Sequence, residues 1–377
     1  MVVKWANIYR DILFQSDYFE DLIEAKYVKE IKHPELPLVL LDYTNEAQFS
    51  RNWDPRLRIA RGLILEINNK NPAEIIKIVA NPFPRFANLG EIKETEVNNL
   101  PDNLFISNKL DGSLVICWYY KYKWYFSTRG SFKSKQSLDA CLWFNEHFST
   151  NKLDPSYTYL FEWISPDNRI VVNYGDRKEL VLLAVRKTEF GEEIHPTELK
   201  YFAKDIGVNY IEFSKFKFGL DKIEFGEPTK DEGRVLYSHS PYLRVKLKSP
   251  EYVRLHKDIT NLCLNNSKWT IFDLVKNNTL HETIRFLPQE YKDLVLERAA
   301  ELLDLYNSII SEAKLLLERT KHLTSRKEKA LLVNEIAPKI SGVFFSLLEN
   351  REEEAKVRAW RLVAKYLEEK EPVSVRQ

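Results

Sequence analysis

Short apolar runs rich in β-branched and aromatic residues recur through the first two-thirds of the chain. Glycine, proline, asparagine and aspartate residues separate these runs, as is typical of strands joined by turns. The runs that predict strands cover residues 36–43, 61–67, 74–80, 113–120, 124–130, 158–164, 169–174, 180–185, 234–237 and 242–248. Because few long helical patterns lie between them, the sequence predicts a mostly antiparallel α+β domain.

Beyond about His256 the pattern changes from strands to helices. Apolar residues recur there at three- and four-residue spacing, in segments rich in Leu, Ala, Glu and Lys, which indicates amphipathic helices. The predicted helical segments cover residues 270–278, 289–320, 325–340 and 351–371. Ten of the 11 glycines fall at or before Gly233, so turns are concentrated in the first part. We therefore expect a first domain of residues 1–257 and an all-α domain of residues 258–377.

Composition adds few constraints. Lys plus Arg is 56 and Asp plus Glu is 55, so the net charge predicts no partner, although a neutral protein can still carry a local basic groove. Cys117, Cys141 and Cys263 lie far apart, which argues against a disulfide framework or a zinc site and suits a reducing compartment. No apolar run approaches the roughly 20 residues that span a bilayer, and the N-terminal residues lack a signal-peptide core. We expect a soluble, cytoplasmic protein, located in the host cytoplasm if its source is viral.

The sequence Lys-Leu-Asp-Gly at residues 109–112 interrupts a strand-like pattern that begins near Phe105 and resumes at Ser113. Asp-Gly between two strands is a standard hairpin signal, and so short a pattern also arises by chance. The alternative is a reactive Lys109 at a strand end, with Asp111 close by and Gly112 letting the chain turn near a ligand. The two interpretations are compatible, because a turn can present the lysine at the base of a pocket.

Two lysines and a glutamate stand out on other predicted strands. Lys246 and Lys248 are two residues apart, so both side chains leave the same face of a sheet. They are either a pair of cations aimed at a polyphosphate or the charges of a solvated edge strand. Glu162 lies between Phe161 and Trp163. A carboxylate there is costly unless it holds a partner or ligand, or alternates outward to solvent.

Further charged residues lie beside glycines at predicted strand ends. Glu232 precedes Gly233, either as a turn residue or as a carboxylate beside a metal ion. Arg61 and Arg129 each precede a glycine, which allows close approach of the backbone to a ligand. One candidate nucleophile, several cations and two or three carboxylates suit phosphoryl or nucleotidyl transfer. The sequence contains no H-E-x-x-H, G-x-S-x-G or G-x-x-x-x-G-K-[ST] motif, and its seven histidines do not cluster like metal ligands.

In order and spacing, these segments resemble the motifs of the covalent nucleotidyltransferases, which are ATP-dependent DNA and RNA ligases and mRNA capping enzymes. KLDGS resembles motif I, FEWISPDNRIVVNY resembles motif III of RNA ligases, DEGRV resembles motif IV and VKLKSPEYV resembles motif V. Upstream, ARGLILEI and NPFPRFANLGE are similar to the phosphate-side elements of the RNA ligase 1 family of bacteriophages. The resemblance runs from about Arg58 to His256. It implies that the first domain is a nucleotidyltransferase (adenylyltransferase) domain with antiparallel sheets.

The resemblance also implies roles for individual residues. Lys109 would be the nucleophile that becomes adenylylated, and Asp111 would orient the lysine or the ribose. Lys246 and Lys248 would contact phosphates during catalysis, with Tyr252 directly behind them. The residues expected to bind ATP are Arg61, Arg85, Lys109, Gly112, Arg129, Glu162, Glu232, Lys246, Lys248 and Tyr252.

Glu232 has a second expected role, and Arg129 and Arg85 differ from the residues that the family usually has. Glu232 would also be the carboxylate beside the metal ion, and Arg129 falls where the family usually has a lysine. The family's KFFN reads RFAN here, so Arg85 replaces a lysine and Ala87 replaces an aromatic residue. These changes are not conservative where a site needs a compact ammonium or a stacking ring. They bear on the handling of the leaving group and leave the reaction class unchanged.

The C-terminal segments favour one branch of the superfamily. DNA ligases and capping enzymes would be expected to continue with a small OB-type β-barrel, whereas the residues after His256 indicate helices. RNA ligation is therefore the favoured function, and a DNA ligase, a guanylyltransferase or an inactive nucleic-acid-binding relative are the alternatives. The helical domain is a candidate for recognising RNA shape, such as a tRNA-like stem-loop, although a solvated helix face and loop is the favoured explanation for any single one of its basic residues. The candidate phosphate contacts are Arg319, Lys321, Arg326, Lys327 and Lys329.

The resemblance implies ATP-dependent RNA ligation in three steps. Lys109 takes AMP from ATP, the AMP passes to an RNA 5′-phosphate, and a 3′-hydroxyl attacks this activated end. The implied cofactors are ATP as AMP donor and Mg²⁺, with Mn²⁺ as a substitute. The implied partner is RNA with 5′-phosphate and 3′-hydroxyl ends, such as a nicked tRNA anticodon loop in RNA repair, and we expect a monomer. We also expect Lys246, Lys248 and partial desolvation to lower the pKa of Lys109 from its ordinary value of about 10.4.

Overall fold

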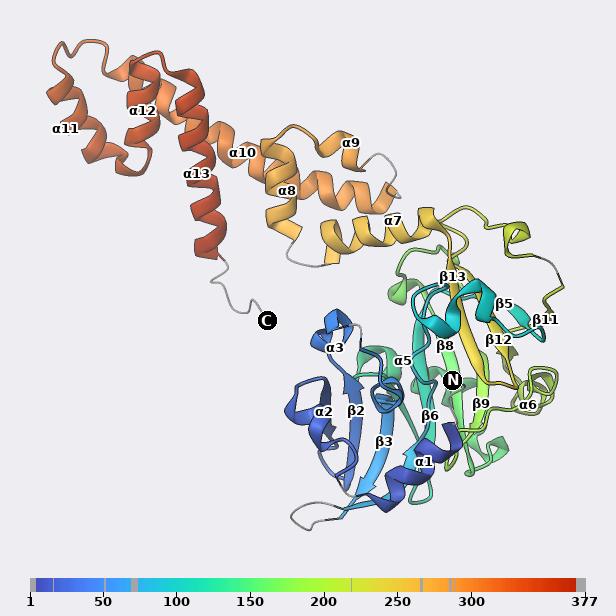
Figure 1. Ribbon diagram of the computed structural model, residues 1–377. Coiled ribbons are helices and arrows are strands. Elements are labelled where there is room, and N and C mark those ends of the chain that lie inside the picture. The colour runs from blue at the N-terminus through green and yellow to red at the C-terminus, as the bar shows by residue number, and fades with distance from the viewer. Residues whose placement is uncertain are drawn as a thin grey trace. The chain divides into compact units, whose positions relative to one another are not determined.

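The computed structural model describes residues 5–15, 17–50, 52–68, 74–217, 219–264, 267–284, 287 and 289–370. The chain divides into two compact units, Met1–Val253 and Arg254–Gln377, whose elements are labelled in Figure 1. The first unit is built mainly from antiparallel sheets and the second from helices, which confirms the predicted fold class. The roles expected for the two parts stay predictions. In the described ranges, no helix combines the length and the apolar character that crossing a membrane requires.

The first sheet has four antiparallel strands in the order β1-β2-β3-β4. Its strands are β1 Val28–Lys32, β2 Leu38–Tyr43, β3 Arg61–Ile67 and β4 Ile75–Ala80. All six residues of β2 are buried, which explains its uninterrupted apolar run. One face packs against α1 and three short helices in a single apolar cluster. These helices are α1 Trp5–Phe14, α2 Glu20–Glu24, α3 Asn45–Ser50 and α4 Pro55–Ile59.

The second sheet has five strands in the order β10-β9-β8-β6-β7, antiparallel except between β9 and β10. Its strands are β6 Ser113–Tyr120, β7 Lys123–Thr128, β8 Tyr157–Ile164, β9 Glu179–Lys187 and β10 Asn209–Tyr210. One face is covered by α5 (Lys135–His147) and α6 (Leu199–Ile206), which contribute Phe144 and Leu199 to its apolar cluster. Its other face packs against the first sheet, where Ile64 of β3 and Ile116 of β6 share a buried cluster.

The third sheet has four antiparallel strands in the order β11-β5-β12-β13. Its strands are β5 Phe105–Lys109, β11 Ser214–Lys215, β12 Gly233–Ser238 and β13 Leu243–Lys248. Leu236, Val245 and Leu247 lie in a buried apolar cluster on one face. Because side chains alternate along a strand, the lysines of β5 and β13 are left to the opposite face.

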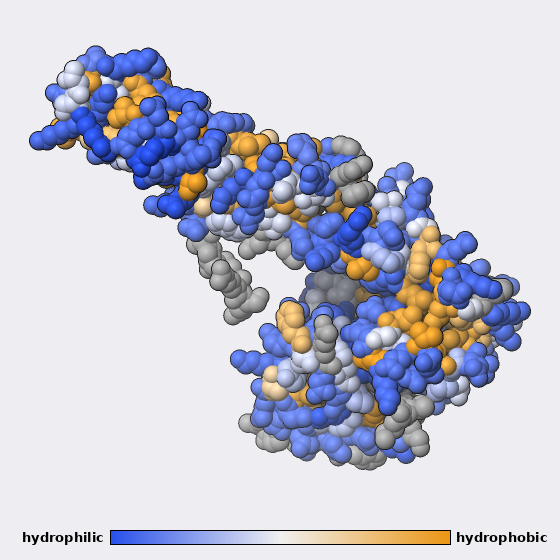
Figure 2. Space-filling model, turned by 45° about the horizontal axis from the view of Figure 1, so that its top comes forward, coloured by the Kyte–Doolittle hydropathy of each residue, from blue (hydrophilic) through white to orange (hydrophobic). Residues whose placement is uncertain are grey.

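The second unit consists of helices. They are α7 Pro250–Ile259, which crosses the boundary between the units, α8 Ser267–Lys276, α9 Leu280–Ile284, α10 Gln289–Arg319, α11 Arg326–Ile336, α12 Ser341–Leu348 and α13 Glu352–Lys370. The long helix α10 contacts α8, α12 and α13, and Tyr306 of α10 stacks on Trp360 of α13 with 4.5 Å between ring centroids. The surface in Figure 2 is largely hydrophilic with scattered hydrophobic positions, and Leu303 and Leu315 of α10 are among the exposed apolar residues.

Short single-turn helices complete the chain at Lys93–Thr95, Val97–Asn99, Thr150–Lys152, Pro166–Asn168, Leu220–Lys222 and Pro338–Ile340, with a π-helix at Thr260–Leu264. One predicted strand is wrong, because residues 169–174 form bends and loops. The backbone amides of Val171 and Val172 donate to the carboxylate of Asp111 instead of to a neighbouring strand. The sequence patterns also did not predict the helices α5, α7 and α12.

Candidate active site

Strand pairing brings the predicted lysines together on one face of the third sheet. Gly233 of β12 pairs with Lys109 of β5 on one side and with Lys248 of β13 on the other. One step along the same face, Val235 pairs with Lys246 in the same way. Directly paired residues point to the same side of a sheet, so Lys109, Lys246 and Lys248 share one face. The two-residue spacing of Lys246 and Lys248 therefore places both side chains on the same face of the sheet, as the sequence predicted.

Gly233 is required by the backbone at the centre of this row. Its φ angle is +145°, and a Cβ atom there would lie 2.0 Å from the carbonyl oxygen of Leu247. With no side chain at this position, the buried carboxylate of Glu232 can reach both lysines. The Lys109 Nζ atom donates to Glu232 Oε2 at 2.6 Å, and the Lys248 Nζ atom lies 2.7 Å from Glu232 Oε1.

The Glu232 carboxylate raises the pKa of Lys109, whereas the sequence led us to expect a lowered pKa. Burial by itself favours the neutral amine, but the carboxylates of Glu232 and Glu162 outweigh burial, so the pKa of Lys109 is raised. The expectation that neighbouring cations lower this pKa is therefore wrong for the protein without nucleotide. The physical reason is that anions of the site lie closer to Lys109 than the cations that would oppose its charge.

Lys246 is the lysine whose charged form is disfavoured. Burial lowers the pKa of Lys246 to about 7, and the like charges of Arg61 and Lys109 act in the same direction. Its Nζ atom lies over the ring of Phe86, 4.8 Å from the centroid. A buried amine among other cations favours an anionic ligand, because an anion would restore the balance of charge.

Glu162 faces into the site and does not alternate outward to solvent. It lies on β8, and burial raises the pKa of its carboxyl to about 8 although the charge of Lys109 opposes the shift. Gly112 passes so close that a Cβ atom there would lie 2.5 Å from the carbonyl oxygen of Trp163 and 3.1 Å from the Cγ atom of Glu162. Gly112, three residues after Lys109, therefore lets β5 and β6 turn directly against the strand that carries Glu162.

Asp111 connects three motif segments. One carboxylate oxygen accepts hydrogen bonds from the backbone amides of Val171 and Val172, at 2.8 and 2.7 Å. The other accepts the hydroxyl of Tyr252 at 2.8 Å. The described contacts include no hydrogen bond from Lys109 to Asp111. In this structure Asp111 therefore positions the segment after β8 and the start of α7, and Tyr252 lies behind the site as expected.

The three predicted arginines differ in their positions. Arg61 of β3 borders the same cavity as Lys109, and its buried Nη1 atom has no hydrogen-bond partner among the described residues. Arg85 stacks its guanidinium on Trp53, 3.6 Å from the ring centroid, and pairs with Glu91. The Nη1 atom of Arg85 is likewise buried without a partner in the described part of the chain.

Arg129 makes its contacts with the first sheet. Its Nε atom lies 3.2 Å from the buried Asp42 carboxylate, and its Nη1 atom donates to the Tyr43 hydroxyl at 2.7 Å. The structure does not place Arg129 among the residues that line the cavity at Lys109. A role of Arg129 in binding ATP stays a prediction.

The RFAN segment is held against β13. The amide of Lys246 donates to the carbonyl of Ala87, and the amide of Leu89 donates to the carbonyl of Lys246, both at 3.0 Å. This pairing holds the segment that contains Arg85 beside Lys246. Trp53 is a residue of the site that the sequence patterns did not reveal, because it lies more than 30 positions from Arg85 and outside every motif. A planar guanidinium can stack on such a ring whereas a lysine ammonium cannot stack in this way, which accounts for arginine at this position.

These residues surround a cavity of about 230 Å³ whose lining combines apolar and charged side chains. The apolar lining residues are Phe83, Phe86, Leu110, Leu114, Leu183, Ile211, Phe213 and Val235. The charged lining residues are Arg61, Lys109, Glu162, Arg244, Lys246 and Lys248. Apolar side chains together with several cations suit a nucleotide, since a base needs apolar contact and phosphates need cations.

The carboxylates of Glu232 and Glu162 suit a metal ion that is bound mainly by the phosphate oxygens of a ligand. No group of three His, Cys, Asp or Glu residues that could hold a metal ion occurs within the described residues. Glu232 and Glu162 are nevertheless both near Lys109, and Mg²⁺ is commonly held by one or two carboxylates together with phosphate oxygens. The donor set therefore fits a metal that arrives with a polyphosphate better than a site made by protein alone.

Comparison with known proteins agrees with these motifs. The model of an RNA ligase family matches residues 59–252, just over half of the chain. A protein of Autographa californica nuclear polyhedrosis virus, provisionally named bifunctional polynucleotide kinase/RNA ligase, is 26% identical over 266 residues, which are 63% of this chain and 36% of the viral protein. A protein of Thermovibrio ammonificans, provisionally named RNA ligase, is 29% identical over 265 residues, which are 63% of this chain and 65% of that protein.

Among solved structures, an archaeal ATP-dependent RNA ligase aligns over 82% of this chain and 83% of its own, with 12% identity and a TM-score of 0.43. The chain spans less than two thirds of the length of the two curated relatives. The stretch matched by the family model nevertheless contains Lys109, Glu162, Glu232 and both lysines of β13. This chain belongs to that RNA ligase family.

Proposed function

We propose that the chain is an ATP-dependent RNA ligase that joins a 5′-phosphate to a 3′-hydroxyl through a lysyl-AMP intermediate. The observation that carries the proposal is the row of Lys109, Gly233 and Lys248 beside a cavity lined by apolar side chains and by several cations. Family membership supports the reaction class, and the chemistry below follows from the positions of this chain's own residues.

The cavity gives ATP one consistent orientation. The base would lie against apolar lining residues, and the phosphates would lie along Lys246, Lys248 and Arg61. The unpartnered Nη1 atoms of Arg61 and Arg85 are donors that a triphosphate oxygen would satisfy. The α-phosphate would then face Lys109 at the end of β5.

In the first step, Lys109 must lose a proton before it can attack. The Glu232 carboxylate already accepts a hydrogen bond from its Nζ atom and is the nearest acceptor for that proton. The Lys109 nitrogen then forms a bond to the α-phosphorus, the bond from this phosphorus to the bridging oxygen breaks, and pyrophosphate leaves with the electron pair. Cations at the β- and γ-phosphates stabilise the charge of the leaving group.

In the second step, an oxygen of the RNA 5′-phosphate attacks the same phosphorus. The phosphorus–nitrogen bond breaks and Lys109 regains a proton as its amine leaves. In the third step, the RNA 3′-hydroxyl loses its proton and attacks the activated 5′-phosphate, and AMP leaves. Lys246 and Lys248 remain beside the reacting phosphate in each step and would stabilise its developing charge.

Glu232 and Glu162 would hold a divalent metal ion together with phosphate oxygens. When bound, Mg²⁺ or Mn²⁺ supplies neutralisation of phosphate charge. Glu232 contacts both Lys109 and Lys248, so a metal ion held by Glu232 would share its carboxylate with these lysines.

The biological setting is part of the same proposal. We propose RNA ends such as those of a nicked tRNA anticodon loop as the substrate, a monomer as the working form and the cytoplasm as the location. Cys117 and Cys141 are free thiols, which suits a reducing compartment. Of the basic residues expected to contact RNA, Lys321 and Arg326 form ion pairs with Glu318 and Glu349, so both would have to exchange partners.

A covalent-adduct assay tests the proposal. Wild-type protein incubated with α-³²P-ATP and Mg²⁺ should retain label in a band that is stable to base and lost in acid, as expected for a phosphoramidate. The Lys109→Ala variant should form no adduct, whereas Lys123→Ala, which changes an exposed lysine outside the cavity, should label normally. An adduct in Lys109→Ala contradicts the assignment, and labelling by GTP alone would indicate a guanylyltransferase.

A further inference from the structure

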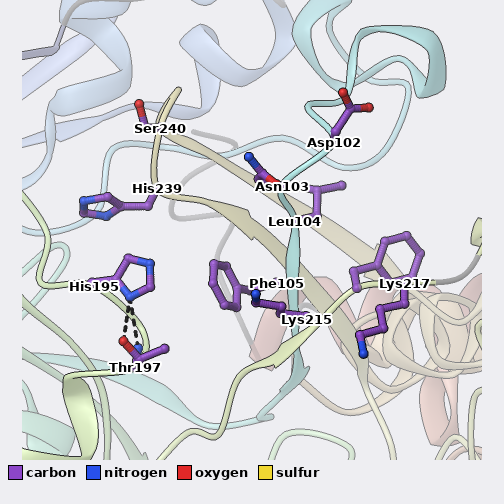
Figure 3. Close-up of a pocket in the computed structure, with 11 residues that line it drawn as sticks. Asp102, Asn103, Leu104, Phe105, His195, Thr197, Lys215, Lys217, His239 and Ser240 are labelled. Atoms are coloured by element: carbon purple, nitrogen blue, oxygen red, sulfur yellow. Dashed lines mark hydrogen bonds between the residues drawn. The ribbon is translucent and has the colours of Figure 1, made fainter.

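A second cavity, of about 540 Å³, lies at the opposite end of the sheet that carries Lys109. Phe105 begins β5, Lys215 belongs to β11 and His239 directly follows β12. His195 comes from the loop after β9. Figure 3 shows His195, Phe105 and His239 close together on one side of this cavity. No motif discussed above uses these residues.

The rings give the cavity a surface suited to a flat ligand. The centroids of Phe105 and His195 are 5.3 Å apart with an interplanar angle of 85°. Those of His195 and His239 are 5.2 Å apart with an angle of 72°. His195 is half-buried and His239 is exposed. Aromatic and imidazole rings of this kind stack on unpaired bases of single-stranded RNA.

Both imidazoles have Nδ1 occupied by a contact within the protein. The amide of Thr197 donates to Nδ1 of His195 at 3.3 Å, and the Thr197 hydroxyl lies 2.8 Å from the same atom. Burial lowers the pKa of His195. The Tyr237 hydroxyl lies 3.0 Å from Nδ1 of His239. The Nε2 atom of each ring has no hydrogen bond among the described residues, so it can bind a base edge or a 2′-hydroxyl.

Two lysines supply positive charge at the same cavity. Lys215 and Lys217 line it and are exposed, and neither has an ion-pair partner among the described residues. Figure 3 shows Lys217 on the side away from His195. Lys217 could therefore hold the phosphate of a nucleotide while the rings of His195 and Phe105 hold its base.

Other ligand classes fit less well. A bound metal ion is disfavoured because, in the described parts of the chain, no three His, Cys, Asp or Glu side chains form a group that could hold one. A free polyphosphate would need cations that converge, whereas this cavity combines separated lysines with rings and also contains Asp102. A single nucleotide unit uses the rings, the imidazole Nε2 atoms and the lysines together.

We propose that this cavity binds one nucleotide of the RNA substrate, a few positions from the end that is being joined. The inference rests on the proposed function and names a site for its substrate. Phe105 and Lys109 leave the same face of β5 and are four residues apart, about 13 Å at roughly 3.3 Å per residue. Tyr237 and Arg244 are buried on the face between the two sites, so a strand with its end at Lys109 would span this distance over the outside of the protein and place a later nucleotide in the cavity.

The first test uses RNA length. The His195→Ala/His239→Ala variant should bind a fluorescent 5′-phosphorylated 12-mer about tenfold more weakly than wild type, because it loses the rings on which a base would stack. Binding of a dinucleotide, which is too short to reach both sites, should not change. The lysyl-AMP adduct should form at the wild-type rate. A thermal unfolding curve that matches wild type confirms that the variant is folded.

The second test uses salt and does not depend on the rings. The Lys215→Ala/Lys217→Ala variant should lower the slope of log affinity against log salt concentration by about 1.4, because each lysine releases counterions from a single strand. The control is Lys200→Ala/Lys204→Ala, which removes the same charge from the exposed side of α6 and should leave the slope unchanged. A DNA 12-mer should bind more weakly than RNA if the imidazoles contact 2′-hydroxyls.

The outcomes separate this inference from the proposed function. Equal losses for the dinucleotide and the 12-mer, or an unchanged salt slope, would overturn the RNA site. Competition by free AMP or inorganic phosphate alone, with no effect of RNA length, would also overturn it and indicate a small-molecule site. If wild type forms no lysyl-AMP, the proposed function fails, while the binding measurements still test the cavity directly.

Discussion

Lys109 and Lys246 lie on the same face of the sheet, but their pKa values shift in opposite directions. The carboxylates of Glu232 and Glu162 raise the pKa of Lys109 against the effect of burial. Burial and neighbouring cations lower the pKa of Lys246 to about 7. Contact with the Glu232 carboxylate therefore stabilises the charged form of Lys109.

The Glu232→Gln variant tests this control of charge. Removing the anion leaves burial as the dominant effect on Lys109, so we expect its pKa to fall below the wild-type value. In a pH series without ATP, Lys109 should therefore begin to react with an amine-specific reagent at lower pH, as measured by mass spectrometry of the labelled peptide. The Glu227→Gln variant is the control, because Glu227 pairs with Lys230 at the surface. A pKa of Lys109 that stays the same or rises in Glu232→Gln would show that another group sets it.

At the scale of elements, the sequence predicted a strand correctly where burial alone determined the pattern of residues. The continuous apolar run of β2 is explained by burial on both faces of the strand. The alternating lysines of β13 are explained by burial on one face only. Residues 169–174 have the same β-branched composition, yet the carboxylate of Asp111 takes the amides that a strand would need. That competition is not visible in sequence, because Asp111 lies some 60 positions away.

The same limit applies to the site. The motifs predicted Lys109, Glu162 and the lysines of β13, which line one cavity, and Glu232, which contacts Lys109 and Lys248 beside it. The stack of Arg85 on Trp53 could not be predicted, since neither residue has a periodic signal and the contact depends on how the segment after α3 folds. The raised pKa of Lys109 was also beyond reach, because its sign depends on distances to carboxylates rather than on residue types.

Asp111 joins elements from three motifs, and Tyr252→Phe tests that connection. The substitution removes a buried hydroxyl that donates to the carboxylate at 2.8 Å, while the amides of Val171 and Val172 remain. We expect the free energy of unfolding to fall by about 1.5–3 kcal/mol, the usual range for a hydrogen bond to a charged group. Urea unfolding curves measure this change.

The ring of Tyr252 stays in place in this variant, so Lys248 keeps its position above it. Adduct formation should therefore fall much less than in Lys109→Ala. The control is Tyr122→Phe, because Tyr122 is 93% exposed and its hydroxyl should not affect stability. An unfolding free energy equal to wild type in Tyr252→Phe would mean that Asp111 is satisfied without the tyrosine.

At the scale of the molecule, the two units differ in chemistry as well as in fold. All residues placed at the candidate active site belong to the first unit. The second unit carries basic residues on and near α11, of which Arg319, Lys327 and Lys329 have no ion-pair partner within the described ranges. This division predicts that the second unit contributes to RNA affinity and leaves adenylylation unchanged.

The Arg319→Ala/Lys327→Ala/Lys329→Ala variant separates these two contributions. Each lost phosphate contact should lower the salt slope of binding to single-stranded RNA by about 0.7, so the triple variant should lose about 2. The rate of lysyl-AMP formation should equal wild type. A matched control is Lys356→Ala/Arg358→Ala/Lys365→Ala, which removes equal charge from residues already paired with Glu353, Glu354 and Glu369. Equal slopes for the two triple variants would show that the basic residues of α11 only solvate the helix surface, and a slower adduct would show that the second unit acts on the first step.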